Sequence, residues 1–290
     1  MVRCLLVAAA LFAWVNACLA EEITKQTITV GGRQRVYLID VPPGGGQWPT
    51  IVMLHGLGGS GRGVATATHL APLGEQNGFV TVFPNALVHQ WNHFLPGMIP
   101  PDKARHYRPV GGTPDDAGFL KALLADLIHR GVTDPKRVYL GGFSAGGFMA
   151  LRMVCDDSRA FAAVALISSS MPSALGQHCS PAAPIPILME KGTADRRVPY
   201  RGGDVLDHSF TVWSAAEMTG FFTKLDGCGG QPDISHQTGA NNVKIDVSDW
   251  ADCSKGGPVT LYTFNGGIHK VYQKPPPART LWDFFKPHAR

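Results

Sequence analysis

One serine of the chain stands in a pattern that is typical of catalytic nucleophiles. Residues 142–146 are Gly-Phe-Ser-Ala-Gly, a G-x-S-x-G pattern with Ser144 at its centre. The residues before it, 138–140, have the composition of a buried strand, and those after it, 145–154, of a helix. A serine on such a turn lies at a helix N-terminus, where an anionic oxygen is favoured. The pattern therefore predicts Ser144 as a nucleophile in acyl chemistry.

A serine nucleophile needs a general base and a carboxylate that orients the base. When the serine occupies a strand-to-helix turn, the acid follows it in the chain and the histidine comes last. Asp195 follows the apolar run 185–189, and His269 follows the run 259–264 on a glycine-rich loop. Both positions belong to the sheet edge where open α/β folds build their sites, so we predict a Ser144–His269–Asp195 triad. The alternatives, which lie further from a strand end, are Asp204 and Asp226 for the acid and His208 and His236 for the base.

Two backbone N–H groups are predicted to hold the oxyanion that such a reaction forms. One belongs to Ala145, the residue after the nucleophile. The other belongs to the glycine-rich segment 55–59, His-Gly-Leu-Gly-Gly, which follows a buried apolar run. We assign it to Leu57, with Gly56 as the adjacent alternative.

These residues must be positioned by a framework in which buried apolar runs alternate with amphipathic segments. Such alternation predicts an α/β fold with a mostly parallel sheet covered by helices on both faces. No repeat or linker interrupts it, so residues 21–290 are expected to form a single domain. The expected strands are 27–30, 34–41, 50–54, 79–83, 137–140, 162–167, 185–189 and 259–264. The expected helices are one beginning at Thr113 and those at 145–155, 209–225 and 278–285.

The helix that begins at Thr113 has the clearest start signals. Thr113 is a good N-cap, Pro114 suits the first helical position, and Asp115 and Asp116 complement the helix dipole. We therefore interpret the two aspartates as capping groups and not as a catalytic carboxylate pair. The preceding loop, 96–112, is expected to act as a partial lid.

The N-terminal residues 1–20 have the pattern of a cleaved signal peptide. A positive charge at Arg3 precedes a short apolar run, and small residues end at Ala20, the expected cleavage site. Export to an oxidising compartment predicts two disulfides among the four remaining cysteines, which allow three connectivities. We favour the sequence-local pairs Cys155–Cys179 and Cys228–Cys253.

Composition excludes several other classes of function. The chain has 290 residues and a net charge of +4, spread too evenly to form the basic surface that nucleic acid needs. No mature segment is apolar enough to span a membrane, and no cysteine or histidine spacing suggests a metal site. We expect no cofactor, no metal, no membrane or nucleic-acid partner, and no obligatory protein partner.

The order of its motifs resembles that of a known enzyme group. The chain is similar to the polyhydroxybutyrate depolymerase and feruloyl esterase group of α/β-hydrolases, related to carbohydrate esterase family 1. The matching segments are 54–56, 83–85, 91–92, 115–120, 134–139, 142–147, 192–195, 228–230, 266–269 and 281–285, which span nearly the whole mature chain. The resemblance implies a serine carboxylic-ester hydrolase that acts on hydroxyalkanoate oligomers or polyesters, or on hydroxycinnamoyl esters. It also implies that His55, Trp91 and Asn92 bind the substrate and that Trp91, Asn92 and His93 line the cleft. The alternative for Trp91 is that it packs under a surface loop.

Three departures from the group's pattern lie near the expected site. Lys191 replaces a common histidine, Lys270-Val271-Tyr272 replaces a Thr-Trp pair after the catalytic histidine, and Leu57 stands where a cysteine is frequent. They affect the expected substrate more than the expected chemistry. Two alternatives remain open, namely acyl transfer on the same triad and a catalytically inactive binding protein on a hydrolase scaffold.

Overall fold

The computed structural model describes residues 23–94, 114–205 and 210–290. The predicted signal peptide, the predicted lid 96–112, Thr113 and His208 lie outside the described residues. Among the described residues, no helix has the length and apolar character needed to cross a membrane.

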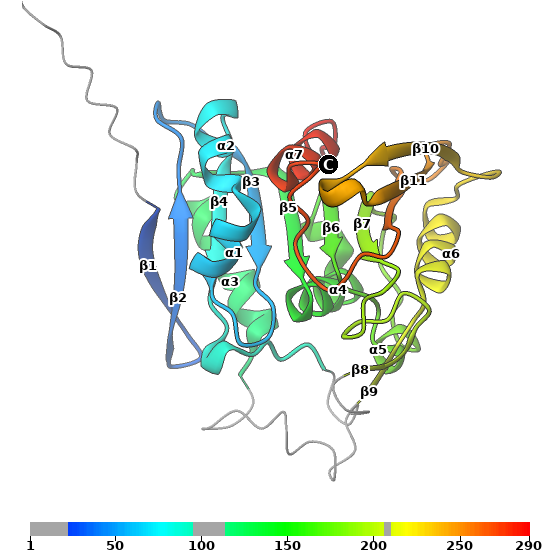
Figure 1. The fold of residues 1–290 in the computed structure, drawn as a ribbon. Helices are drawn as coiled ribbons and strands as arrows, with labels where there is room; N and C mark the ends of the chain where they lie inside the picture. The colour runs from blue at the N-terminus through cyan, green and yellow to red at the C-terminus, as the bar shows by residue number, and fades with distance from the viewer. Residues whose placement is uncertain (1–22, 95–113, 206–209) are drawn as a thin grey trace, which may run out of the picture.

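A ten-stranded sheet runs through the described part of the molecule (Figure 1). Its strand order is β1-β2-β4-β3-β5-β6-β7-β12-β11-β10. The six central strands are parallel: β4 (Val80–Pro84), β3 (Trp48–Leu54), β5 (Thr133–Phe143), β6 (Ala163–Ile167), β7 (Ile187–Gly192) and β12 (Val259–Phe264). Antiparallel strands extend both edges: β1 (Thr24–Val30) and β2 (Arg33–Asp40) on one side, β11 (Lys244–Trp250) and β10 (Asp233–Thr238) on the other. The predicted mostly parallel sheet is confirmed.

Helices cover both faces of this sheet (Figure 1). One face carries α1 (Gly61–Thr68), α2 (Leu70–Asn77) and α7 (Pro277–Phe285). The other carries α3 (Asp116–His129), α4 (Ala145–Asp157), α5 (Ser173–Gly176) and α6 (Ala215–Asp226). The remaining elements are the hairpin β8 (Gly203–Val205) and β9 (Phe210–Val212) and the single 3-10 turns η1 (Leu87–His89), η3 (Ser158–Ala160) and η4 (Ala240–Asn242).

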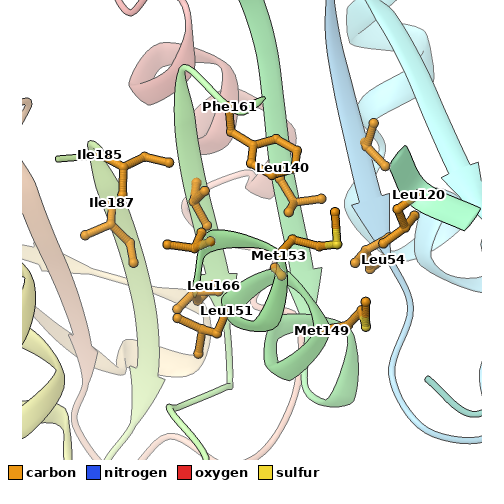
Figure 2. Close-up of a cluster of buried hydrophobic side chains, with 14 of the residues drawn as sticks. Leu54, Leu120, Leu140, Met149, Leu151, Met153, Phe161, Leu166, Ile185 and Ile187 are labelled. Atoms are coloured by element: carbon orange, nitrogen blue, oxygen red, sulfur yellow. The ribbon is translucent and has the colours of Figure 1, made fainter. Parts of the chain in front are cut away.

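Helix α4 is fixed against the centre of the sheet by its apolar face. Met149, Leu151 and Met153 are fully buried and belong to one cluster with Leu54 of β3 and Leu140 of β5 (Figure 2). Burial of a side chain of this size contributes about 1.5–3 kcal/mol. The helix N-terminus, where Ser144 lies, is therefore held rigidly above the carboxyl ends of the parallel strands.

The helix predicted over residues 209–225 is wrong at its start. Residues 210–212 are Phe-Thr-Val, which favours a strand, and they pair with β8. Helix α6 begins only after Ser214, whose side chain and that of Glu217 form a capping box. The cap therefore sets the helix start.

Helices α1 and α2 and the β10–β11 hairpin were not predicted, although the buried Ile245 and Val247 of β11 do alternate with less buried residues. Strand β10 is exposed along its whole length, so it has no alternation of buried and exposed positions. Both helices are short, at eight residues each. The favoured disulfides, Cys155–Cys179 and Cys228–Cys253, are both formed.

Candidate active site

Ser144 occupies a strained turn between β5 and α4. Its φ of 54° and ψ of −120° lie outside the regions that most residues adopt. The flanking glycines make the turn possible. A Cβ on Gly142 would lie 2.3 Å from the backbone of Gly146, and one on Gly146 would lie 2.3 Å from the carbonyl oxygen of Leu54. The turn projects the serine at the carboxyl edge of the sheet.

The predicted triad residues converge there from three loops. His269 Nε2 lies 2.9 Å from Ser144 Oγ, and His269 Nδ1 lies 2.7 Å from Asp195 Oδ2. The three residues are separated by up to 125 positions in the chain but follow β5, β7 and β12. With Nδ1–H donating to the carboxylate, Nε2 is free to accept the serine proton.

The carboxylate of Asp195 is held in its charged form. Burial alone would raise its pKa, but hydrogen bonds from His269 and from the backbone amides of Val198 and Arg197 lower the pKa below its usual value. The two amides bind Oδ1 at 2.9 Å and 2.8 Å, leaving Oδ2 for the histidine. The aspartate is therefore ionised and fixed in orientation at neutral pH.

Ala145 and Leu57 carry the two N–H groups predicted to hold an oxyanion. Ala145 is the first residue of α4, so its amide has no acceptor within the helix. The Leu57 loop lies close by, because a Cβ on Gly56 would be 3.3 Å from Ser144 Cβ. The carbonyl of Gly56 accepts hydrogen bonds from His55 Nδ1 and the Gly59 amide. Since C=O and N–H of a trans peptide point in opposite directions, this bond also fixes the direction of the Leu57 N–H.

A pocket of about 750 Å³ opens onto the serine. Ser144 and His269 lie in its wall with two arginines, Arg196 and Arg197. Apolar side chains form most of the remaining lining: Leu57, Phe143, Phe148, Val198, Val205 and Ile268. A mostly apolar hollow with a few converging polar groups is the usual form of a small-molecule site.

Comparisons with known proteins place this arrangement in a family. A family model described as phospholipase/carboxylesterase matches residues 41–221. The chain belongs to the phospholipase/carboxylesterase family. The matched region includes Ser144 and Asp195, whereas His269 lies beyond it.

Individual relatives agree with the family. The chain is 31% identical to feruloyl esterase B of Piromyces equi over 64% of its own length and 34% of the relative's. It is 25% identical to the bifunctional acetylxylan esterase/xylanase of Neocallimastix patriciarum over 81% of its own length and 30% of the relative's. The chain thus spans about a third of the length of these curated relatives.

A solved structure shows the same fold. The acetyl xylan esterase from Aspergillus awamori superposes with a TM-score of 0.61 at 16% identity, covering 90% of this chain and 99% of that one. At this identity the similarity concerns the fold, and the predicted α/β-hydrolase fold is confirmed.

His55 and Trp91, both predicted to bind the substrate, are buried in this phospholipase/carboxylesterase family member, and Trp91 takes the alternative place under a surface loop. Both are 1% exposed and lie beneath the Leu57 loop. His55 Nε2 accepts a hydrogen bond from the Ala86 amide, and Trp91 Nε1 donates one to the His55 carbonyl at 2.8 Å. Burial lowers the pKa of His55, so the ring is neutral and keeps this pattern. The two side chains support the loop and do not line the described pocket.

Asn92 also has a structural place. The side-chain amide of Asn92 donates to the Pro114 carbonyl, and its backbone N–H donates to Asp116 Oδ2. Asp115 caps α3 through the Gly118 amide, so it has the predicted capping role. The predicted helix start is wrong, because Asp115 is itself the N-cap and Pro114 lies before the helix, which begins at Asp116. Asp116 does more than complement the helix dipole, because it is buried and forms an ion pair with Arg35 of β2 at 2.5 Å.

The described alternatives to the triad lie elsewhere. Asp226 accepts a hydrogen bond from the Ile185 amide, just before the start of β7 and thus at the opposite edge of the sheet. Burial raises its pKa to about 7. His236 pairs with Asp246 on the β10–β11 hairpin, and Asp204 lies on β8. Among the described contacts, the hydroxyl of Ser144 bonds to His269 and to none of these three residues.

Lys191, which replaces a histidine common in the resembled group, is connected to Ser144 through hydrogen bonds of Ser169. It is buried, and its Nζ donates to the Ser169 carbonyl at 3.0 Å. Ser169 Oγ in turn donates to the Ser144 carbonyl at 2.9 Å. Burial lowers the pKa of Lys191 to about 8, against the opposing effect of the Asp195 charge. The lysine thus belongs to the hydrogen-bond network beneath the nucleophile.

The second departure, residues 270–272, also fills a structural role. Tyr272 stacks on Phe264 with ring centroids 3.6 Å apart and donates to the Ile268 carbonyl. The Lys270 carbonyl accepts a hydrogen bond from Ser168 Oγ. These contacts hold the loop that carries His269.

Two charged residues that line the pocket were not predicted from the sequence. Arg196 and Arg197 line it directly after Asp195. Their position next to the predicted acid was the available signal, but exposed arginines are common on any protein surface. Within the described residues, no cluster of three or more His, Cys, Asp or Glu side chains has an arrangement suited to a metal ion.

Proposed function

We propose that this chain is an exported serine carboxylic-ester hydrolase that acts through an acyl-enzyme. The observation that carries the proposal is the continuous hydrogen-bonded line from Asp195 through His269 to Ser144 at the mouth of an apolar pocket. Membership of the phospholipase/carboxylesterase family supports it. Export after cleavage following Ala20 is part of the proposal, and the two disulfides support it.

The first half of the reaction transfers the acyl group to the enzyme. His269 Nε2 accepts the proton of Ser144 Oγ as that oxygen attacks the ester carbonyl carbon. The carbonyl oxygen becomes an oxyanion, which the N–H groups of Ala145 and Leu57 stabilise. The carbon–oxygen bond to the alcohol then breaks, and the imidazolium returns its proton to the departing alcohol.

The second half regenerates the serine. Water gives a proton to His269 and its hydroxide adds to the acyl carbon, forming a second oxyanion at the same two amides. The bond to Ser144 Oγ breaks, the serine takes the proton back, and the carboxylic acid leaves. Asp195 remains ionised throughout and stabilises the charged imidazole.

The substrates belong to the classes that the sequence resemblance implies. They are hydroxyalkanoate oligomers or polyesters and hydroxycinnamoyl esters of the feruloyl type. The feruloyl esterase and the acetylxylan esterase/xylanase among the relatives support an ester of plant polysaccharide.

A panel of esters tests the proposal. Purified protein is assayed on short p-nitrophenyl esters, methyl ferulate and hydroxybutyrate oligomers, with Ser144→Ala as the matched control. We expect turnover by the wild type, a loss of at least about 10⁴-fold in the variant, and a fluorophosphonate adduct on Ser144 in the wild type alone. Equal turnover by the two proteins would contradict the assignment of the nucleophile, and no labelling would favour an inactive binding protein.

A further inference from the structure

The wall of the Ser144 pocket carries an excess of positive charge. Arg196 and Arg197 both line this pocket and are exposed to solvent. No carboxylate belongs to the described lining of the pocket. The nearest one, Asp195, has a side chain that is 1% exposed and binds His269, Arg197 N and Val198 N. The described lining of the pocket therefore holds two permanent positive charges and no negative one.

Neither guanidinium is used to stabilise the described part of the fold. Several arginines of the described ranges form ion pairs that stabilise the fold, such as Arg35 with Asp116 and Arg152 with Asp156. Arg196 and Arg197, in contrast, form no ion pair with any residue of the described ranges. Their fork of N–H donors thus remains available at the pocket, and this group matches a carboxylate in geometry and charge.

The arginines are also held at a defined place relative to the triad. Asp195 Oδ1 accepts hydrogen bonds from the amides of Arg197 and Val198, which closes a turn that carries both arginines. The other oxygen of this carboxylate orients His269. Since Val198 is 2% exposed and packs in the apolar cluster with Phe148 and Ala145, the end of the turn is anchored as well.

We propose that Arg196 and Arg197 form an anion subsite that binds a carboxylate on the ester substrate, so that the enzyme prefers esters carrying a free carboxylate over neutral esters of the same size. The inference rests on the proposed hydrolase activity and adds a substrate class to it. The carboxylate belongs either to the acyl part or to the alcohol part of the ester. In both cases the bound group is the same, and the experiment distinguishes the two sources.

Matched ester pairs test the subsite. For the acyl side, p-nitrophenyl hemiadipate is compared with p-nitrophenyl hexanoate; for the alcohol side, p-acetoxybenzoate is compared with p-acetoxybenzamide. The readout is the ratio of kcat/KM for the charged ester to that for the neutral ester. It is measured in the wild type, Arg196→Gln, Arg197→Gln, the double variant and Arg279→Gln, a control arginine on α7 that is exposed and distant from the pocket.

We expect each pocket substitution to lower the ratio by about fivefold for one of the two pairs, in keeping with an exposed charge interaction. Arg279→Gln should leave both ratios unchanged, and added salt should lower the wild-type ratio through screening. The pair that responds identifies whether the acyl or the alcohol part carries the carboxylate.

The outcomes separate this inference from the proposed function. If the neutral esters are hydrolysed but both ratios stay within twofold in the double variant, the subsite is overturned and the hydrolase activity stands. If the wild type hydrolyses none of the four esters, the proposed function fails, and the subsite fails with it.

Discussion

Two hollows of similar size lie at the surface of this protein, and only one of them has converging functional groups. The pocket at Ser144 has a volume of about 750 Å³; the groove between α7 and strands β10–β12 has about 590 Å³. In the groove, polar groups pair with close neighbours, as Asp249 does with Thr260 and Asp283 with Lys286. In the pocket, groups from three distant loops join in one hydrogen-bonded line. Size alone therefore does not indicate a site; convergence of loops at the carboxyl ends of parallel strands does.

The largest expected difference between the two hollows concerns their aspartates. We expect Asp195→Asn to lower kcat/KM on a p-nitrophenyl ester by about 10³- to 10⁴-fold. The histidine loses the anion that orients it and that holds the proton on Nδ1. Asp249→Asn, the matched change in the groove, should alter kcat/KM by less than about twofold, as surface substitutions do. A variant Asp195→Asn with more than a tenth of the wild-type activity would remove the distinction.

The two disulfides differ in what they enclose. Cys155–Cys179 closes a loop that contains the central strand β6, whereas Cys228–Cys253 closes one that contains the β10–β11 hairpin beside the groove. Their sequence separations of 24 and 25 are almost equal, so each double Cys→Ser variant should lose about 3 kcal/mol of unfolding free energy. Urea unfolding measures this loss.

Activity and hydrogen exchange then separate the two disulfide variants. In Cys228→Ser/Cys253→Ser we expect faster amide exchange over residues 233–250 and kcat/KM within about twofold of the wild type, because the triad loops lie elsewhere. In Cys155→Ser/Cys179→Ser we expect faster exchange in β6 and α4. An exchange pattern that spreads equally through both regions in both variants would contradict the comparison.

Strand β7 adds a pH-dependent difference on the groove side of the sheet. Glu190 points to the same face as Leu188, which lines the groove. It is 2% exposed, and one of its oxygens has no hydrogen-bond partner among the described residues. Burial raises the pKa of Glu190 to about 8. Between the ordinary carboxyl pKa and this value, the folded state keeps a proton that the unfolded state has lost. Its contribution to stability is therefore complete at acid pH and is lost as the pH rises through about 8.

The variant Glu190→Gln tests this sign. As the pH rises from about 5 to about 8, the stability of the variant relative to the wild type should increase by about 3 kcal/mol of unfolding free energy, because the wild-type carboxyl loses its proton and the amide does not titrate. Denaturant unfolding at several pH values measures the difference. Lys191 titrates in both proteins, so its contribution to the unfolding free energy cancels from the difference. A difference that does not change with pH would show that the carboxyl is ionised in the fold.

The smallest effect is expected for the charged rim of the groove. Arg279→Gln should change the unfolding free energy by less than about 0.5 kcal/mol and kcat/KM by less than about twofold. Thermal unfolding and ester kinetics check it. A large loss of activity would show that the groove takes part in the reaction.

The sequence predicted what depends on local pattern and order along the chain. The glycines around Ser144, the apolar strands and the late acid and histidine were enough to predict the fold class and which residues converge. Strand β10 was missed because it is exposed along its whole length, and the β8–β9 pair was missed because three residues a strand are too few to show an alternating pattern.

The predicted substrate-binding residues show the limit most clearly. His55, Trp91 and Asn92 were identified by resemblance, which marks a position as important without saying which atoms it contacts. In the fold, Trp91 and His55 support the Leu57 loop from beneath, and Arg196 and Arg197 occupy the pocket wall. Whether a side chain faces a ligand or its own backbone depends on loop conformation, which sequence spacing does not specify.

The two oxygens of Asp195 have different partners, and they connect the proposed triad to the proposed anion subsite. Oδ2 binds the imidazole of His269, whereas Oδ1 binds the amides of the turn that carries the two arginines. An insertion or deletion that reshapes the turn to admit another ester would also tilt the carboxylate and thus the histidine. Exchange of the two guanidinium side chains leaves the backbone of the turn in place. Diversification of substrate preference in this lineage is therefore expected to proceed by point replacement at positions 196 and 197 and not by changes in loop length.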